Sequence, residues 1–564
     1  MADNEAKLPD PELDHKVETG QSSARSLEDV SSAEDQSPGD SGQDDVPYSS
    51  NLQLGLILIA LALSIFLIGL DGTIVGTAIP SITKDFQQLN DVGCLLTTCA
   101  MQLSYGKLYT LFPVKSCFLS AVFIFEVGSL VCAVAPNSTA LIVGRAIAGL
   151  GAAGVISGVF IIQSYTIPLR FRPTVGGLLG AMEGIAMAVA PLISGALTQH
   201  VTWRWCFYIN LPLGGFSLAV IALLFRNPKN QELVPMSFKE KLLSMDLVGF
   251  IILVPSTVCL LLALQWGGTT FAWGNARIIV LLILSVVLFG AFISVQAYKK
   301  TKATLPIHVL RQRSVSLSIV YAFCMGGSIF LVEYYLPIWF QSIKGASPSH
   351  SGVMLLPILI ALVLAGVATG FAVTAVGYYK PFMIAGSICT AVATGLMSTF
   401  TATTGHSSWI GYQVLFGFGV GMGFQQSFIA VQTVLPQKDI PIGTTAVIFA
   451  NNLGGAVFVS VANNLFTNKL TEGLAKYVPA VDPAAILAAG ATDWRTKVSP
   501  ALLSEVLATY NFALTRTFLA SMALGCATVV AAAAVEWKSV KRGKVVPKEE
   551  DQAPCSAGSE KPNV

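Results

Sequence analysis

The sequence predicts an all-α membrane protein with 14 transmembrane helices. Of its 564 residues, 53% are hydrophobic and 12% are charged, a balance that a water-soluble globular domain does not have. Apolar stretches follow one another from Leu52 almost to the C-terminus, and each approaches the roughly 20 residues of helix that cross a bilayer core about 30 Å thick. The predicted spans are 53–77, 93–111, 116–134, 139–162, 174–197, 205–225, 246–264, 277–297, 314–338, 351–374, 380–400, 409–434, 442–466 and 513–535.

The charges between the spans predict the orientation of the chain. If the N-terminus is cytoplasmic, most lysines and arginines of the short connections, such as Arg170, Arg172 and Lys438, lie on the cytoplasmic side. The basic residues after the last span lie on the same side. This distribution follows the positive-inside rule, so we expect both termini in the cytosol.

The composition of the two ends of the chain predicts tails. The first 50 residues carry 13 acidic side chains against three basic ones and almost nothing apolar, so we expect a disordered acidic cytoplasmic tail without a signal peptide. The basic residues after the last span predict a basic cytoplasmic tail at 538–564.

Two connections are long enough to contain helices of their own. The charged, amphipathic segment 227–246 predicts an interfacial helix on the cytoplasmic side. The outer segment 467–515 predicts a short helix around 500–509. On the same outer side, Asn137 begins an Asn-Ser-Thr glycosylation sequon, although it lies very close to the membrane.

Several function classes lack any motif in this chain. The ten cysteines form no CxxC pair and lie mostly in apolar segments, so we interpret them as small buried hydrophobic residues. The five histidines are scattered, and no HExxH, GxSxG or GxxxxGK[ST] motif occurs. We therefore predict no metal site, no cofactor, no ATP-driven pump and no enzyme. The chain also has no basic patch for nucleic acid.

Four motifs of the first half resemble those of a known family. They are LDGTIVGTAIPSI (Leu70–Ile82), GRAIAGLGAAG (Gly144–Gly154), GIAMAVAPLISGAL (Gly184–Leu197) and WRWCFYINLPLG (Trp203–Gly214). In this order they resemble the first-, fourth- and fifth-helix motifs and the sixth-helix hallmark of the 14-span drug:proton antiporters of the major facilitator superfamily.

Three segments of the second half resemble one branch of that family, the fungal efflux pumps for toxins and other secondary metabolites. They are YYLPIWFQSIKGASPSHSGVMLLP (Tyr334–Pro357), FGFGVGMGFQQSFIAVQTVLP (Phe416–Pro436) and NNLGGAVFVSVANNLF (Asn451–Phe466). The resemblance implies the major facilitator fold, in which two six-helix bundles expose a midplane site alternately to each side. It places the first bundle at 51–226, a cytoplasmic linker with two extra spans at 227–313 and the second bundle at 314–537. It also implies a monomeric, proton-coupled exporter of a small organic molecule in the plasma membrane, with the vacuolar membrane as the alternative.

The chain departs from the family pattern in two places. Between Asp91 and Leu95 it is several residues shorter than its relatives usually are, so the second span is barely long enough to cross the bilayer. In the loop after that span, Thr110 stands where the superfamily has an aspartate. A charge relay built on that aspartate is therefore absent.

Ionisable residues inside the spans are functional candidates, because charge in hydrocarbon is costly. Arg145, in the fourth-helix motif, requires a buried acceptor and either couples and gates transport or forms a structural ion pair. Asp71 either takes part in coupling or pairs locally with Thr73 or a backbone NH. Glu183 is a candidate for proton or substrate binding, Glu333 for the substrate cavity, and Glu126 is a weaker candidate because the third helix is usually peripheral in this fold.

Other candidates concern the fifth and twelfth spans. Pro191, with Gly184 and Gly195, breaks or bends the fifth helix, either as a hinge for outward release or as a fixed kink. Phe424, Gln425 and Gln426 either face a central substrate cavity or pack and bond between helices.

Three rival functions remain open from the sequence. One is a 14-span uptake permease for a siderophore or a basic amino acid, and another is a transporter-like sensor that moves no solute. The third is a membrane-embedded enzyme, for which no motif exists. The fifth-helix motif favours export, because it is associated with antiporters.

Overall fold

The protein is built from α-helices throughout the residues that its structure, a computed structural model, describes: 51–86, 93–228, 231, 236–268, 271–299, 303–490, 494–495 and 498–541. Most of the predicted tails and the start of the shortened segment before the second span lie outside these residues. The long helices are α1 Asn51–Phe86, α2 Gly93–Leu111, α3 Val114–Ala133, α4 Ser138–Thr166, α5 Arg172–His200, α7 Asn210–Leu224, α9 Leu247–Trp266, α10 Ala276–Lys299, α12 Arg313–Lys344, α14 Leu356–Val376, α15 Lys380–Met397, α16 His406–Val434, α17 Ile440–Tyr477 and α20 Leu503–Ala534. Short helices are η1 Leu169–Phe171, α6 Trp205–Tyr208, α8 Phe238–Ser244, α11 Ile307–Arg311, α13 Pro348–Val353 and α18 Pro483–Ala488.

Thirteen helical segments of the described residues are long and apolar enough to cross a membrane, against 14 predicted spans. The remaining predicted span, 93–111, coincides with α2, which has 19 residues and includes Gln102 and Lys107. Gln102 and Lys107 are buried, because α2 packs against α4, α9 and α17 instead of facing lipid with its polar side. Helix α2 can therefore contain polar residues at membrane depth, because other helices surround them.

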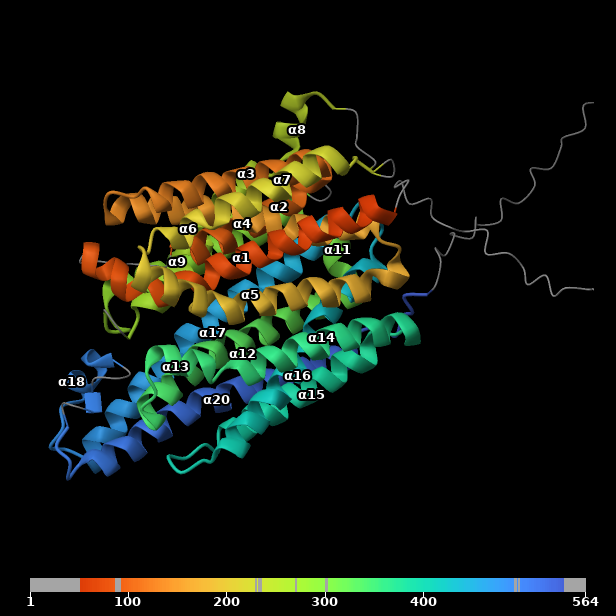
Figure 1. Cartoon of the computed structure of the whole chain (residues 1–564). Helices are drawn as coiled ribbons and strands as arrows, with labels where there is room; N and C mark the ends of the chain where they lie inside the picture. Colours follow the sequence, from red (N-terminus) through yellow and green to blue (C-terminus); the bar gives the residue numbers. More distant parts are fainter. Residues whose placement is uncertain are drawn as a thin grey trace, which may run out of the picture. The chain divides into compact units, whose positions relative to one another are not determined.

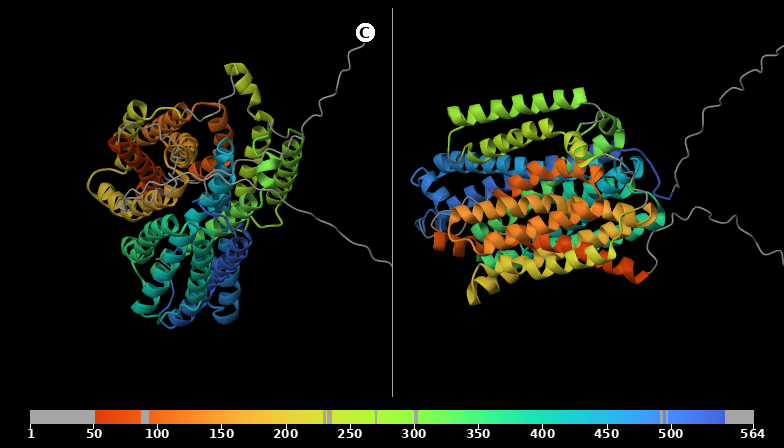
Figure 2. Two further views of the ribbon diagram at one scale, coloured as in Figure 1. Left: turned by 90° about the vertical axis from the view of Figure 1, so that its right-hand side faces the viewer. Right: turned by 90° about the horizontal axis from the view of Figure 1, so that it is seen from above.

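The helices pack in two groups (Figure 1). The first group contains α1, α2, α3, α4, α5 and α7, and the second contains α12, α14, α15, α16, α17 and α20. The groups meet mainly where α5 packs on α14 and where α2 packs on α17, and α16 also contacts α5 while α17 also contacts α4. Figure 2 (left) shows the helices nearly end-on, with α9 and α10 paired at one side.

Two predicted boundaries on the outer side are wrong. The short helix expected at 500–509 is the first part of α20, which runs without interruption from Leu503. Likewise α17 continues to Tyr477, beyond the predicted end at 466. Polar residues mark where a helix leaves the bilayer, but they do not end its hydrogen bonding. Helix α8 at Phe238–Ser244 lies within the segment where an amphipathic helix on the cytoplasmic side was expected.

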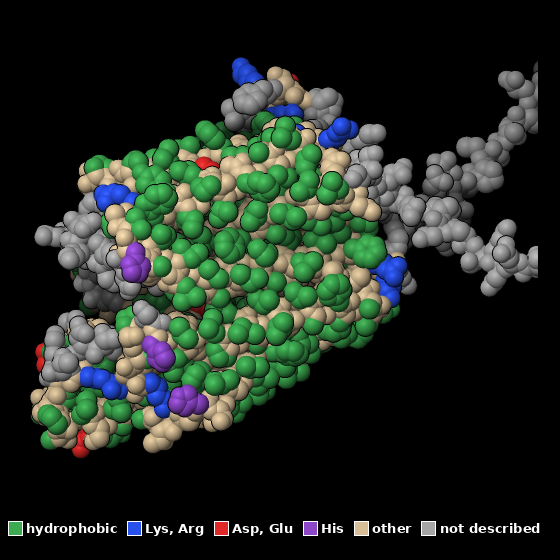
Figure 3. Space-filling view, viewed as in Figure 1, with side chains coloured by type: hydrophobic (Ala, Val, Ile, Leu, Met, Phe, Trp, Pro, Cys, Tyr) green, Lys and Arg blue, Asp and Glu red, His purple; other side chains and the backbone are tan. Residues whose placement is uncertain are grey.

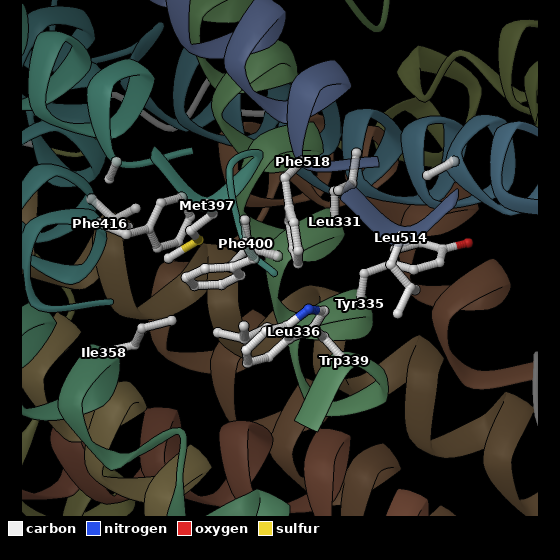
Figure 4. Close-up of a cluster of buried hydrophobic side chains, with 14 of the residues drawn as sticks. Leu331, Tyr335, Leu336, Trp339, Ile358, Met397, Phe400, Phe416, Leu514 and Phe518 are labelled. Carbon is white, nitrogen blue, oxygen red and sulfur yellow. The ribbon is translucent and has the colours of Figure 1, made fainter. Parts of the chain in front are cut away.

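The apolar residues divide between an aromatic core and the outer surface. Trp339 of α12 stacks on Phe400 at 4.5 Å between ring centroids, and Phe518 of α20 meets Phe400 edge-on (Figure 4). On the surface, large apolar side chains cover the long sides of the helices, whereas lysines and arginines gather toward their ends (Figure 3). This is the surface that a bilayer requires.

The cysteines were interpreted as small buried hydrophobic residues, and most of those with described side chains are buried, whereas Cys526 is exposed. None of the eight cysteines whose side chains are described forms a disulfide, and five of them are buried. No group of three or more His, Cys, Asp or Glu residues that could hold a metal ion occurs among the described residues.

Candidate functional site

A buried ion pair joins α1 to α4. The guanidinium of Arg145 donates from Nη1 to both carboxylate oxygens of Asp71 at 2.8 Å. The two residues are 6% and 2% exposed. Arg145 thus has the buried acceptor that the sequence required. The Thr73 hydroxyl donates instead to the carbonyl of Gly69, so the alternative in which Thr73 holds Asp71 is wrong.

Asn210 of α7 extends this pair into a network that the sequence analysis missed. Its side-chain amide donates to Asp71 at 3.3 Å and to the Ser129 hydroxyl of α3 at 3.2 Å. The ring of Phe207 lies 5.7 Å from the Arg145 guanidinium carbon, in cation–π range. The available signal was the polar Asn210 inside the apolar sixth-span motif, which the analysis treated as a family hallmark only.

Glu126 of α3 lies beside the network. It is 8% exposed, and neither of its carboxyl oxygens has a hydrogen-bond partner among the described residues. A Cβ on Gly214 would overlap its Oε1, so the carboxyl is packed directly on the backbone of α7. Glu126 was the weaker candidate because the third helix is usually peripheral in this fold, but its own carboxyl is buried because α7 covers it.

Glu183 and Glu333 are carboxyls on two different helix groups. Glu183 lies on α5 of the first group and Glu333 on α12 of the second. Both side chains are partly exposed, and they are near enough for the charge of one to act on the other. Two carboxyls at such a boundary can hold a proton or attract a cationic group.

The fifth helix makes a close contact with the second group. A Cβ on Gly177 would lie 2.5 Å from the carbonyl oxygen of Gly366 in α14, and one on Gly184 would lie 2.9 Å from the Val363 side chain. Gly195 has open space instead. Helix α5 runs unbroken through Pro191, so the expected break is wrong and only a bend or a local hinge is compatible with the structure.

The predicted cavity residues of α16 lie at the boundary between the groups. Gln425 and Gln426 are buried, and the Gln425 amide lies against Gly180 of α5. Phe424 packs edge-on against Phe428, whose ring stacks on Phe160 of α4 at 4.6 Å. These residues therefore connect α16 to both α4 and α5.

Polar contacts also join the groups near the predicted cytoplasmic ends of their helices. Thr174 at the start of α5 and Thr374 near the end of α14 share a hydrogen bond of 2.8 Å. Gln437, after α16, donates to the carbonyl of Ser164 near the end of α4 at 3.0 Å. These hydrogen bonds hold the two groups together on this side.

Three other residues have local roles. Asn137 caps α4 by accepting from the backbone N–H of Ala140 at 2.8 Å, and it is exposed. Thr110, at the position of the missing aspartate, bonds its hydroxyl to the carbonyl of Gly106. Arg516 of α20, an intramembrane cation that the sequence analysis missed, lines a cavity of about 340 Å³ near the outer end of α20. None of the predicted site residues lines that cavity.

Comparisons with known proteins agree with this architecture. The model of the Major Facilitator Superfamily matches residues 61–459. The chain is 46% identical over 507 residues to "MFS-type efflux pump MFS1" of Arthroderma benhamiae, covering 89% of this chain and 95% of that protein. It is also 46% identical over 503 residues to "Efflux pump aflT" of Aspergillus parasiticus, covering 88% and 98%.

Solved structures show the same fold at low sequence identity. The proton:xylose symporter XylE is 14% identical with a TM-score of 0.55, covering 87% of this chain and 97% of that one. The human organic anion transporter MFSD10 is 12% identical with a TM-score of 0.53, covering 84% and 99%.

Proposed function

Because the chain belongs to the major facilitator superfamily, we propose that it is a proton-coupled efflux transporter that exports a small organic molecule by alternating access. The proposed cargo is a fungal toxin, another secondary metabolite or a drug. Its relatives named as efflux pumps match nearly their whole length, which supports export as the direction of transport. We further infer a monomer in the plasma membrane.

The observation that carries proton coupling is the pair of carboxyls at the boundary between the helix groups. Glu183 and Glu333 belong to groups that must move relative to each other in alternating access. Separation of the groups changes both the hydration of each carboxyl and its distance from the other. Because hydration and a nearby like charge both decide whether a carboxyl holds a proton, the same movement changes proton binding.

A substrate path between the groups is the second part of the proposal. Aromatic and amide side chains from α4 and α16, among them Phe160 and Gln425, line the boundary and suit a flat organic molecule. The contacts of Thr174 with Thr374 and of Gln437 with Ser164 keep the predicted cytoplasmic side together. Their opening would admit substrate from the cytosol, and their closure would precede release outside.

The proposal is tested by efflux from cells that express the chain. Cells are loaded with the cation rhodamine 6G or the anthraquinone emodin, and efflux is followed with an acidic exterior, with an uncoupler and in empty-vector controls. We expect faster efflux of at least one compound, abolished by the uncoupler. Efflux that the uncoupler leaves unchanged contradicts proton coupling, and net accumulation of both compounds favours uptake.

The role of Glu183 is tested in the same assay. Glu183→Gln is permanently neutral, so we expect it to lose the acceleration by external acid while exchange of internal for external compound persists. The matched control is Glu472→Gln, a surface carboxyl paired with Lys469, which should behave as wild type. A full response to acid in Glu183→Gln would place proton coupling elsewhere.

A further inference from the structure

Glu126 is a buried carboxyl with no hydrogen-bond donor among the residues that the structure describes. It lies on α3, one helical turn before Ser129, and its Oε1 touches the backbone of Gly214 on α7. Asn210, one turn before Gly214, bonds both Ser129 and Asp71. Residues three or four apart share one face of a helix. The carboxyl and the ion-pair network therefore occupy the same contact between α3 and α7.

The surroundings of Glu126 favour its neutral form. A buried carboxylate without donors costs several kilocalories per mole or more, and the Asp71 carboxylate is near enough to repel a second negative charge. The cation facing this region is Arg145 on α4, which is bonded to Asp71. Among the other elements packed against α3, α6 brings Cys206 and Tyr208, and α7 has no titratable side chain. Helix α2 brings Cys99, Tyr105, Lys107 and Tyr109. No hydrogen bond joins any of these residues to the Glu126 carboxyl among the described residues.

We propose that Glu126 is a proton-binding carboxyl of the transport cycle that shares Arg145 with Asp71. In the described state Glu126 holds the proton and Asp71 holds the guanidinium. In the alternative state the O–H bond on Glu126 breaks, an O–H bond forms on Asp71, and Arg145 pairs with the new Glu126 carboxylate. The net charge of the three groups is the same in both states, so the exchange moves a proton between α3 and α1 without burying an additional charge.

This inference rests on the proposed proton-coupled function and adds a second titratable site to it. Asp71 and Glu126 lie on different helices of the first group, with Arg145 on a third. The exchange therefore changes which helices the guanidinium connects. Asn210 already bonds α1 and α3 at once, so a shift of either helix changes its hydrogen bonds. Proton transfer and helix packing are coupled through these contacts.

The protonation of Glu126 is tested on purified protein in lipid nanodiscs. Infrared spectra at neutral pH report protonated carboxyl groups through their C=O stretching band. We expect Glu126→Gln, which keeps shape and neutrality, to lose part of this band. The matched control Glu505→Gln changes an exposed carboxyl and should leave the band unchanged. An unchanged band in Glu126→Gln means that Glu126 is ionised, which overturns the inference.

The transport role is tested with rhodamine 6G and emodin in the efflux assay. We expect Glu126→Gln to reach the cell surface and to lose the acceleration by external acid, with gradient-free exchange retained. A full response to acid in Glu126→Gln overturns the inference and leaves the proposed function intact. No response in the wild type overturns the proposed function itself.

A second variant keeps the test valid if Glu126→Gln fails to fold. Glu126→Asp retains a titratable carboxyl but withdraws it from Gly214. We expect it to keep a response to acid with a shifted pH midpoint, because the shorter side chain changes its distance from Arg145. A midpoint identical to that of the wild type overturns the inference.

Discussion

Arg145 and Asp71 show how a buried charge constrains its surroundings. Removing two opposite charges from water costs several kilocalories per mole for each ion, and their attraction repays this only with good geometry. Here Nη1 of Arg145 reaches both carboxylate oxygens, and Asn210 adds a third hydrogen bond to Asp71. These hydrogen bonds therefore offset the desolvation cost of the ion pair. If one partner is removed, the desolvation cost of the remaining buried charge is no longer offset.

Arg145→Ala should stop transport and destabilise the protein. It leaves the Asp71 carboxylate buried beside Glu126 with only the Asn210 amide, a loss of about 3–5 kcal/mol. The measurements are efflux at matched surface expression and thermal unfolding of the purified protein. In the double variant Arg145→Gln with Asp71→Asn, both charges are gone, so stability should recover more than efflux does. Wild-type efflux in Arg145→Ala would contradict a coupling role.

Asp246 organises the hairpin of α9 and α10 at its predicted cytoplasmic end. Its carboxylate caps α9 through the N–H of Gly249 and accepts from Gln296 and Lys299 of α10. Burial by itself would raise the pKa of Asp246, but the hydrogen bonds from Lys299, Gly249, Gln296 and Thr304 outweigh it and hold the pKa below the ordinary 3.8.

Asp246→Asn should reduce stability in a pH-dependent way. A lowered folded-state pKa stabilises the protein fully above the unfolded-state value, and that contribution disappears as pH falls through the folded-state pKa. We therefore expect the wild type to unfold at a higher temperature than Asp246→Asn near neutral pH, with the difference narrowing in acid below about pH 4. A difference that stays constant with pH would argue against the ionised cap.

Helix α5 packs closely on α14 at Gly177, where there is no room for a Cβ atom. Gly177→Ala should destabilise the protein by about 1–3 kcal/mol, because its methyl would meet the backbone oxygen of Gly366 at 2.5 Å, and backbone does not yield as a flexible side chain does. Gly195→Ala, on the same helix but facing open space, is the control and should unfold near the wild-type temperature. Equal unfolding temperatures for both variants would refute the packing argument.

Substitution of Pro191 tests whether α5 bends during transport. The helix is continuous through this residue, yet proline removes one backbone donor and weakens the helix locally. If this weakness acts as a hinge, Pro191→Ala should lower efflux more than surface expression while raising thermal stability. Unchanged efflux would identify Pro191 as a fixed kink.

The whole chain is expected to cross the membrane an even number of times. Thirteen apolar segments and the more polar α2 make 14 crossings, which returns the C-terminus to the side of the N-terminus. Tags at Ala2 and Val564 should therefore both resist external protease in intact cells and both be cut after permeabilisation. Cleavage of one tag in intact cells would mean that α2 or another helix does not cross.

The sequence by itself determined the helical class of the chain and where its spans lie, since a span depends on a continuous apolar run. It predicts their orientation from the charges beside them. It also identified Asp71, Arg145 and Glu183 as ionisable groups inside the spans. Only the tertiary structure decided which of them meet. Asp71 and Arg145 are 74 positions apart, and their hydrogen bonds depend on how α1 and α4 pack, which no local pattern specifies. The burial of the Glu126 carboxyl could not be predicted for the same reason, because it depends on Gly214 of α7. A hydrogen-bond partner is decided by distances of a few tenths of an ångström between helices far apart in the chain.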